Sequence, residues 1–211
     1  MRFLLSILLV VAFAGTTTAQ QIDHLQVILV DTSPSMDGRL QDAFGQLLGI
    51  LKKYPPSPKR PVVVIQYAQN VRSWKRFTNL KPALAHASAK PNQGGGTNHP
   101  VGLSAAIKEL NGIAAQKNAS VSIFWIADGN DVLKPETIAL AKKIDAFFAS
   151  RQETKFGPSI NLWRWSDASI SDNCLKSVTE ALPHATINTG SFEDLHKGIH
   201  SITANPKIEL A

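Results

Sequence analysis

Five oxygen-bearing side chains stand at three separate places in the chain, and each place follows an apolar run or a run of glycines. They are Asp31, Ser33, Ser35, Thr97 and Asp128. Carboxylate and hydroxyl oxygens are the ligands that hard divalent cations prefer. If the apolar runs 25–30 and 121–127 are neighbouring parallel strands, the five side chains meet at one edge of a sheet. The residue types then predict an all-oxygen pocket suited to a divalent cation.

The elements that must position these side chains alternate between strands and helices. Continuous apolar runs predict strands that are buried on both faces, and apolar residues spaced three or four apart predict helices. The predicted strands are 25–30, 62–68, 72–77, 121–127, 159–165 and 185–188, and the predicted helices are 38–53, 101–110, 135–149, 171–182 and 191–203. The interval from 78 to Thr97 is predicted to be a loop.

This alternation predicts an α/β fold with a mostly parallel six-stranded sheet and helices on both faces. A turn at Gln69 and Asn70 predicts a hairpin, so 72–77 should be an antiparallel strand at the sheet edge. In a sheet with the order 3-2-1-4-5-6, the order reverses between the first and fourth strands. Ligands of such sheets bind at that reversal, beyond the carboxyl ends of the strands.

Three segments resemble the metal-site segments of von Willebrand factor A (vWA) domains. They are Asp31-Thr-Ser33-Pro-Ser35, Gly-Gly-Gly-Thr97 and Ile-Ala-Asp128-Gly. The resemblance extends in order and spacing over about residues 22–203. It implies a three-layer, Rossmann-like vWA fold with a metal-ion-dependent adhesion site. It also implies that Ser33, Ser35 and Thr97 bind the ion directly, whereas Asp31 and Asp128 act largely through bound waters.

The function expected from this resemblance is protein binding and not catalysis. A cation held by neutral hydroxyls keeps most of its charge, so an open coordination position attracts an anion. The ion would be Mg²⁺, or else Ca²⁺ or Mn²⁺, and an Asp or Glu of a partner protein would complete its coordination. Asp37, His99 and Asp167 are predicted to lie on the rim of the site.

Two other functions are compatible with the same residues. One is a scaffold component of an envelope assembly, in which the metal serves stability. The other is a metal-dependent hydrolase, for which His99 is the candidate general base, although no nucleophile motif accompanies it.

Simpler interpretations exist for single residues. Asp31 and Ser33 are suited to cap a following helix, and Asp128 is suited to begin a turn. His196 and His200 have the spacing of a zinc clip on a helix, but no third ligand is evident nearby, which favours two exposed histidines.

The start of the chain has the pattern of a secretory signal peptide. Arg2 is followed by the apolar stretch 3–14 and by small residues at Thr17 and Ala19, which predicts cleavage after Ala19. Residues 1–19 would then be removed, and 20–211 would form a single periplasmic or extracellular vWA domain without a membrane span. Cys174 is the one cysteine, so no disulfide can form within the chain. The net charge is +6, but the basic residues are scattered, which argues against a nucleic-acid partner. The oligomeric state is left open.

Overall fold

The computed structural model describes residues 20–89, 94–127, 134–151, 159–164, 177–178, 180–184 and 186–190. Several features predicted from the sequence lie outside these residues. They are the signal peptide at 1–19, Asp128, Asp167, Cys174, His196, His200 and the helix at 191–203.

Strands and helices alternate along the described chain. The strands are β1 (His24–Asp31), β2 (Val62–Tyr67), β3 (Val71–Phe77), β4 (Ser120–Ala127), β5 (Ser159–Arg164) and β6 (Thr186–Gly190). The helices are α1 (Leu40–Lys53), α2 (Leu80–Ser88), α3 (His99–Gly112) and α4 (Pro135–Ala149), and a short 3-10 helix, η1 (Pro34–Met36), lies between β1 and α1.

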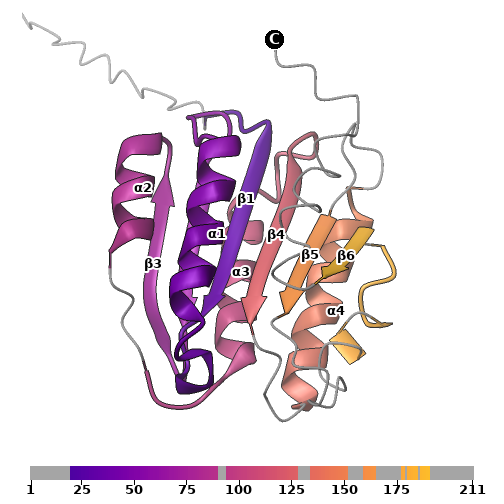
Figure 1. Ribbon diagram of the computed structural model, residues 1–211. Coiled ribbons are helices and arrows are strands. Elements are labelled where there is room, and N and C mark those ends of the chain that lie inside the picture. Colours follow the sequence, from indigo (N-terminus) through magenta and orange to yellow (C-terminus); the bar gives the residue numbers. More distant parts are fainter. Residues whose placement is uncertain are drawn as a thin grey trace, which may run out of the picture.

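The strands form one mixed sheet in the order β3-β2-β1-β4-β5-β6. β2 and β3 pair antiparallel, and the other neighbouring strands pair parallel. Figure 1 shows β3 running against the direction of β1, β4 and β5. The order reverses between β1 and β4, which places the carboxyl ends of these two strands at the switch point of the sheet. The predicted α/β class with a mixed sheet is confirmed.

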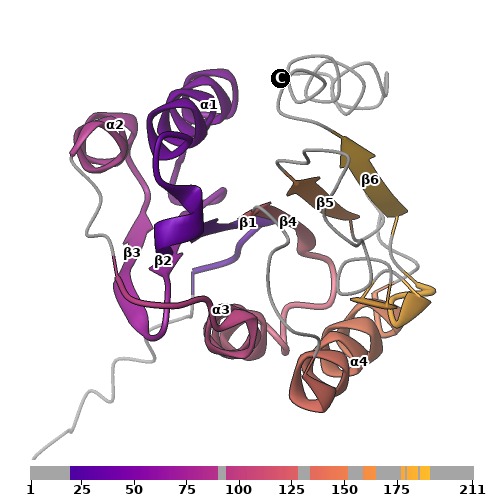
Figure 2. The same ribbon diagram turned by 60° about the horizontal axis from the view of Figure 1, so that its bottom comes forward.

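Helices cover both faces of the sheet, so the fold has three layers (Figure 2). α1 and α2 lie on one face, and α3 and α4 lie on the other. β1 feeds both cores, because Leu25, Val27 and Leu29 belong to the cluster under α3 and α4, and Ile28 and Val30 belong to the cluster under α1. This two-sided burial explains why the strand is apolar without interruption.

The loop predicted between 78 and Thr97 is wrong in part, because α2 lies within it. The side chain of Asn79 caps this helix by accepting a hydrogen bond from the Lys81 N–H at 3.2 Å. Ala83 and Ala87 are its buried residues, and they pack in the cluster shared with α1. The helix is short, its buried stripe consists of small side chains, and Pro82 lies in its first turn, where proline is tolerated. These features gave a weak helical pattern in the sequence.

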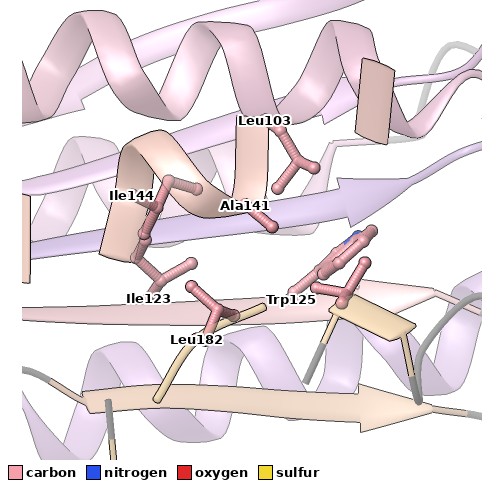
Figure 3. A pocket seen from close by; sticks show the side chains of 7 residues that line it. Leu103, Ile123, Trp125, Ala141, Ile144 and Leu182 are labelled. Atoms are coloured by element: carbon pink, nitrogen blue, oxygen red, sulfur yellow. The ribbon is translucent and has the colours of Figure 1, made fainter. Parts of the chain in front are cut away.

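A small apolar cavity of about 10 Å³ lies between β4, α3 and α4 (Figure 3). It is lined by Leu103, Ile123, Trp125, Ala141, Ile144, Val178 and Leu182. This volume barely admits one water molecule, and the lining offers a water too few polar partners. The cavity is therefore a packing gap and not a ligand pocket.

Among the residues described, no helix is long and apolar enough to cross a lipid bilayer.

Candidate metal centre

The chain leaving β1 is held by the last residue of that strand. The Asp31 side chain is fully buried, and its Oδ1 accepts a hydrogen bond from the Ser33 backbone N–H at 2.8 Å. A bond from an aspartate to the amide two residues later closes a tight turn. Thr32, in the middle of this turn, donates to the Tyr67 carbonyl from its N–H at 2.7 Å and from its Oγ1 at 3.1 Å. The turn is therefore attached both to itself and to the end of β2.

This turn places two hydroxyl groups side by side. Ser33 Oγ and Ser35 Oγ lie 2.9 Å apart, with Ser33 fully buried and Ser35 half-buried. η1 follows directly, and its Met36 is buried in the core cluster under α1. The structure thus brings the Asp31 carboxylate and the two serine hydroxyls together at the carboxyl end of β1.

The glycine loop that carries Thr97 lies against the same turn. The Gly94 N–H donates to the Thr32 carbonyl at 3.3 Å. Gly96 has a φ of +63°, a conformation that glycine adopts without strain. Thr97 follows it and is half-buried. The Thr97 loop therefore lies beside the exit of β1.

The turn between β2 and β3 holds the other side of this loop. The Gln69 N–H donates to the Gly95 carbonyl at 3.2 Å, and Asn98 Nδ2 donates to the Gln69 carbonyl at 3.3 Å. Asn98 Oδ1 in turn accepts from Lys134 Nζ at 3.3 Å, which links the loop to the start of α4. The loop is hydrogen-bonded at both ends of its glycine run.

The carboxyl end of β4 lies next to that of β1. Val30 pairs with Ile126, and β4 ends at Ala127. Asp128 is the next residue in the sequence and lies outside the described residues, as does Asp167. Of the predicted rim residues, Asp37 is exposed, and its Oδ1 accepts from the Gly38 N–H at 3.1 Å.

His99 does not lie on the rim. Its side chain is fully buried, and its Nδ1 lies 3.0 Å from Tyr67 Oη. The same Tyr67 hydroxyl accepts a hydrogen bond from Trp125 Nε1 at 2.5 Å. Sequence reasoning assigned no role to Tyr67 or Trp125 at this site. Their signal was that of aromatic residues with a polar atom near the carboxyl ends of buried strands, where such atoms need a partner.

The donor set suits a hard cation. In an octahedral magnesium shell with metal–oxygen distances of about 2.0–2.1 Å, adjacent ligand oxygens lie about 2.9 Å apart. The Ser33 and Ser35 hydroxyl oxygens already have this separation of 2.9 Å. Across the described part of the chain, no three His, Cys, Asp or Glu side chains gather as a metal site. Hydroxyl oxygens are thus the donors that the described residues offer at the β1 end.

The family model for the von Willebrand factor type A domain matches residues 26–130. The chain belongs to the von Willebrand factor type A family. The matched segment runs from β1 to just beyond β4, so it contains the turn at Asp31, the glycine loop and the end of the central strand. No curated protein matches the sequence significantly.

Solved structures share the vWA fold at low sequence identity. Proximal thread matrix protein 1 from the mussel byssus has a TM-score of 0.62 and 16% identity, covering 86% of this chain and 47% of that protein. Manganese-loaded TRAP protein from Plasmodium vivax has a TM-score of 0.57 and 14% identity, with 85% and 73% covered. The vWF domain of the type V pili tip protein Mfa5 from Porphyromonas gingivalis has a TM-score of 0.57 and 12% identity, with 92% and 98% covered. The chain thus spans about half the length of the mussel protein and nearly all of the pilus tip domain.

Proposed function

We propose that this vWA domain binds a partner protein through a divalent cation held at the carboxyl ends of β1 and β4. The residues that would hold the cation are Asp31, Ser33, Ser35, Thr97 and Asp128. The observation that carries the proposal is the 2.9 Å spacing of the Ser33 and Ser35 hydroxyl oxygens beside the buried Asp31 carboxylate.

The chemistry of these residues favours binding of an anion. Serine and threonine hydroxyls donate lone pairs but carry no charge, so a bound cation would remain strongly electrophilic at an open position. The Asp31 carboxylate is turned toward the Ser33 amide, and it would compensate the ion's charge from a short distance. We infer that Mg²⁺ is the ion, with Mn²⁺ and Ca²⁺ as substitutes, and that an Asp or Glu side chain of the partner completes its coordination. A relative of the same fold is described as manganese-loaded, which supports a divalent cation.

We further propose that the protein works outside the cytoplasm, after removal of residues 1–19. The signal-peptide pattern supports export. The fold neighbours include a byssus matrix protein and a pilus tip protein, both named for extracellular structures. The exposed Asp37 and the residue Asp167 are proposed to lie on the partner-binding rim.

The two alternatives make different predictions. In a scaffold with a structural metal, removal of the cation would lower the melting temperature and leave assembly with the partner intact. In a hydrolase, turnover would depend on the metal and on a general base. The candidate base His99 is fully buried and bonded to Tyr67, which disfavours this alternative.

The test compares two threonines with the same substitution. Thr97→Ala removes a proposed ligand, whereas Thr78→Ala alters an exposed threonine just before the Asn79 cap. Titration with Mn²⁺, followed by electron paramagnetic resonance, should show binding by the wild type and by Thr78→Ala. Thr97→Ala should bind at least about tenfold more weakly. Absence of Mn²⁺ and Mg²⁺ binding by the wild type would refute the proposed site.

A second experiment addresses the partner. Pull-downs from the native compartment would be made with the wild type, with and without EDTA, and with Thr97→Ala. A partner retained only by the cation-loaded wild type supports the proposal. A partner retained equally in EDTA supports the scaffold alternative.

A further inference from the structure

Tyr67, the last residue of β2, is bonded through its side chain to two elements at once. The residue is fully buried. Its Oη accepts a hydrogen bond from Trp125 Nε1 on β4 and lies 3.0 Å from Nδ1 of His99 on α3. The His99 and Trp125 rings also meet edge to face, with centroids 4.9 Å apart and planes at 90°. Three aromatic side chains from three elements therefore form one buried hydrogen-bonded group.

The backbone and the ring of Tyr67 make two further contacts. Its carbonyl accepts both hydrogen bonds from Thr32, which fix the turn after β1. Its ring lies so close to α3 that a Cβ at Gly102 would stand 2.8 Å from Tyr67 Cδ1. A glycine at this position lets α3 approach the strand closely.

The segments that Tyr67 contacts are those that carry the proposed ligands. Thr32 lies between Asp31 and Ser33. His99 lies two residues after Thr97, in the first turn of α3. Trp125 lies three residues before Asp128 in the sequence. These segments are distant in the chain, and none of them is fixed relative to the others by local structure alone.

We propose that Tyr67 is the positioning residue of the cation site, which it serves by fixing the three ligand-bearing segments relative to one another. The inference rests on the proposed function, because it concerns the same site. Tyr67 does not touch the cation in this proposal. Groups that orient metal ligands in this way commonly change affinity by about 10–100-fold when they are removed.

Tyr67→Phe isolates the contribution of the hydroxyl group. The ring, its packing on Gly102 and the backbone carbonyl all stay, while the acceptor of the Trp125 N–H and the neighbour of His99 Nδ1 are lost. Two measurements are needed. The first is the dissociation constant for Mn²⁺, and the second is the amide hydrogen-exchange rate of residues 94–98 in the metal-free protein.

Two control variants separate positioning from general stability. Tyr54→Phe makes the same change at the C-cap of α1, away from the site. Ile65→Val shortens a fully buried side chain on the same strand, which typically costs about 0.5–1.5 kcal/mol without removing a polar atom. We expect Tyr67→Phe to weaken Mn²⁺ binding at least about tenfold and to accelerate exchange at 94–98, and both controls to do neither.

The outcomes distinguish the inference from the function on which it rests. If the wild type binds Mn²⁺ and Tyr67→Phe binds it equally well with unchanged exchange, the positioning role is wrong and the cation site stands. If the wild type binds no cation, the proposed function fails, and exchange in the metal-free variant still decides whether Tyr67 orders the loop. An affinity loss shared by Ile65→Val would reduce the effect to stability and overturn the inference. Should Tyr67→Phe not fold, Trp125→Phe removes the donor of the same hydrogen bond and must reproduce both effects.

Discussion

The backbone N–H of Ser33 donates to Asp31 Oδ1 at 2.8 Å, so the last residue of β1 holds the first serine of the following turn. A buried carboxylate in contact with an amide N–H remains oriented without a cation. The turn is thus built before any ion arrives, which reduces the conformational cost of binding one. This relationship makes the charge of Asp31, and not its shape, the property to test.

Asp31→Asn should abolish cation binding while keeping the fold. The amide oxygen of asparagine can still accept the hydrogen bond from Ser33, but the negative charge beside the proposed ion is lost. We expect Mg²⁺ at 100 times its dissociation constant to stabilise the wild type by about 2.7 kcal/mol and the variant not at all. Thermal unfolding with and without Mg²⁺ measures this difference.

Asp37→Asn is the matched control for that experiment. Asp37 is exposed and accepts from the neighbouring Gly38 N–H, so its substitution should leave the stabilisation by Mg²⁺ unchanged. If Asp37→Asn lost the stabilisation and Asp31→Asn kept it, the ligand assignment would be reversed. A change in partner affinity alone in Asp37→Asn would agree with a rim position.

Gly96→Ala should damage the site, whereas Gly95→Ala should not. Gly96 has a φ of +63°, and a Cβ there would lie 2.6 Å from Gln69 Oε1. A Cβ on Gly95 would meet nothing within 4 Å. Alanine at Gly96 must change the backbone or displace Gln69, at a cost of about 1–2 kcal/mol, and this moves the adjacent Thr97. Urea unfolding and Mn²⁺ titration of both variants check the prediction, and equal behaviour of the two would contradict it.

The sequence was sufficient to predict the features that depend on one segment at a time. β1 and β4 were predicted because strands buried on both faces are apolar throughout, and the sheet order followed from alternation with helices. The position of Asp31 at the end of its strand followed from the point where the apolar run stops. α2 was missed because its stripe of small residues and its early Pro82 gave little helical signal.

The surroundings of His99 could not be predicted in the same way. Proximity in sequence to Thr97 suggested a rim position, but the direction of the side chain depends on Tyr67 and Trp125, which belong to two other elements. The hydrogen bond between Tyr67 and Trp125 joins residues 58 positions apart. Such contacts follow from the assembled sheet and from the close approach of α3 at Gly102, and no local pattern contains them.

Acid should destabilise the fold through His24, the first residue of β1. Its ring nitrogens lie 2.7 Å from Ser120 Oγ and 2.9 Å from Ser122 Oγ. Burial, together with the positive charge of Arg60, lowers the pKa of His24 from 6.5 to about 4. Because the unfolded chain then takes up a proton more readily, this contribution to stability is complete above pH 6.5 and is lost as the pH falls toward 4.

The size of that effect can be isolated with His24→Gln. Wild-type stability should fall by about 2 kcal/mol between pH 7.5 and pH 5 through this histidine, in addition to the contribution of other groups. Glutamine keeps hydrogen-bonding atoms near both serines but does not titrate in this range. Urea unfolding of both proteins at the two pH values gives the difference, and parallel pH dependences would rule out the histidine as the cause.

Arg151 should contribute strongly to stability and nothing to the cation site. Its side chain is almost fully buried at the end of α4, and its guanidinium donates to the carbonyls of Ile113 at 2.6 Å, Gln116 at 2.6 Å and Ala119 at 2.9 Å. These carbonyls follow the last turn of α3, where the helix dipole favours a positive charge. Arg151→Met keeps the length of the side chain but leaves buried carbonyl oxygens without their donor.

We expect Arg151→Met to lower the free energy of unfolding by about 2–4 kcal/mol, and Arg151→Lys to lower it less, because lysine keeps the charge but not the planar fork. Lys143→Met, an exposed position on the same helix, should change it by less than about 0.5 kcal/mol. Guanidinium chloride unfolding measures all three. Because Arg151 lies at the amino end of β4 and the proposed ligands lie at the carboxyl end, Mn²⁺ affinity below the unfolding transition should stay at the wild-type value. A parallel loss of Mn²⁺ affinity in folded Arg151→Met would mean that the cation site depends on the whole length of α3 and not on the contacts around Tyr67.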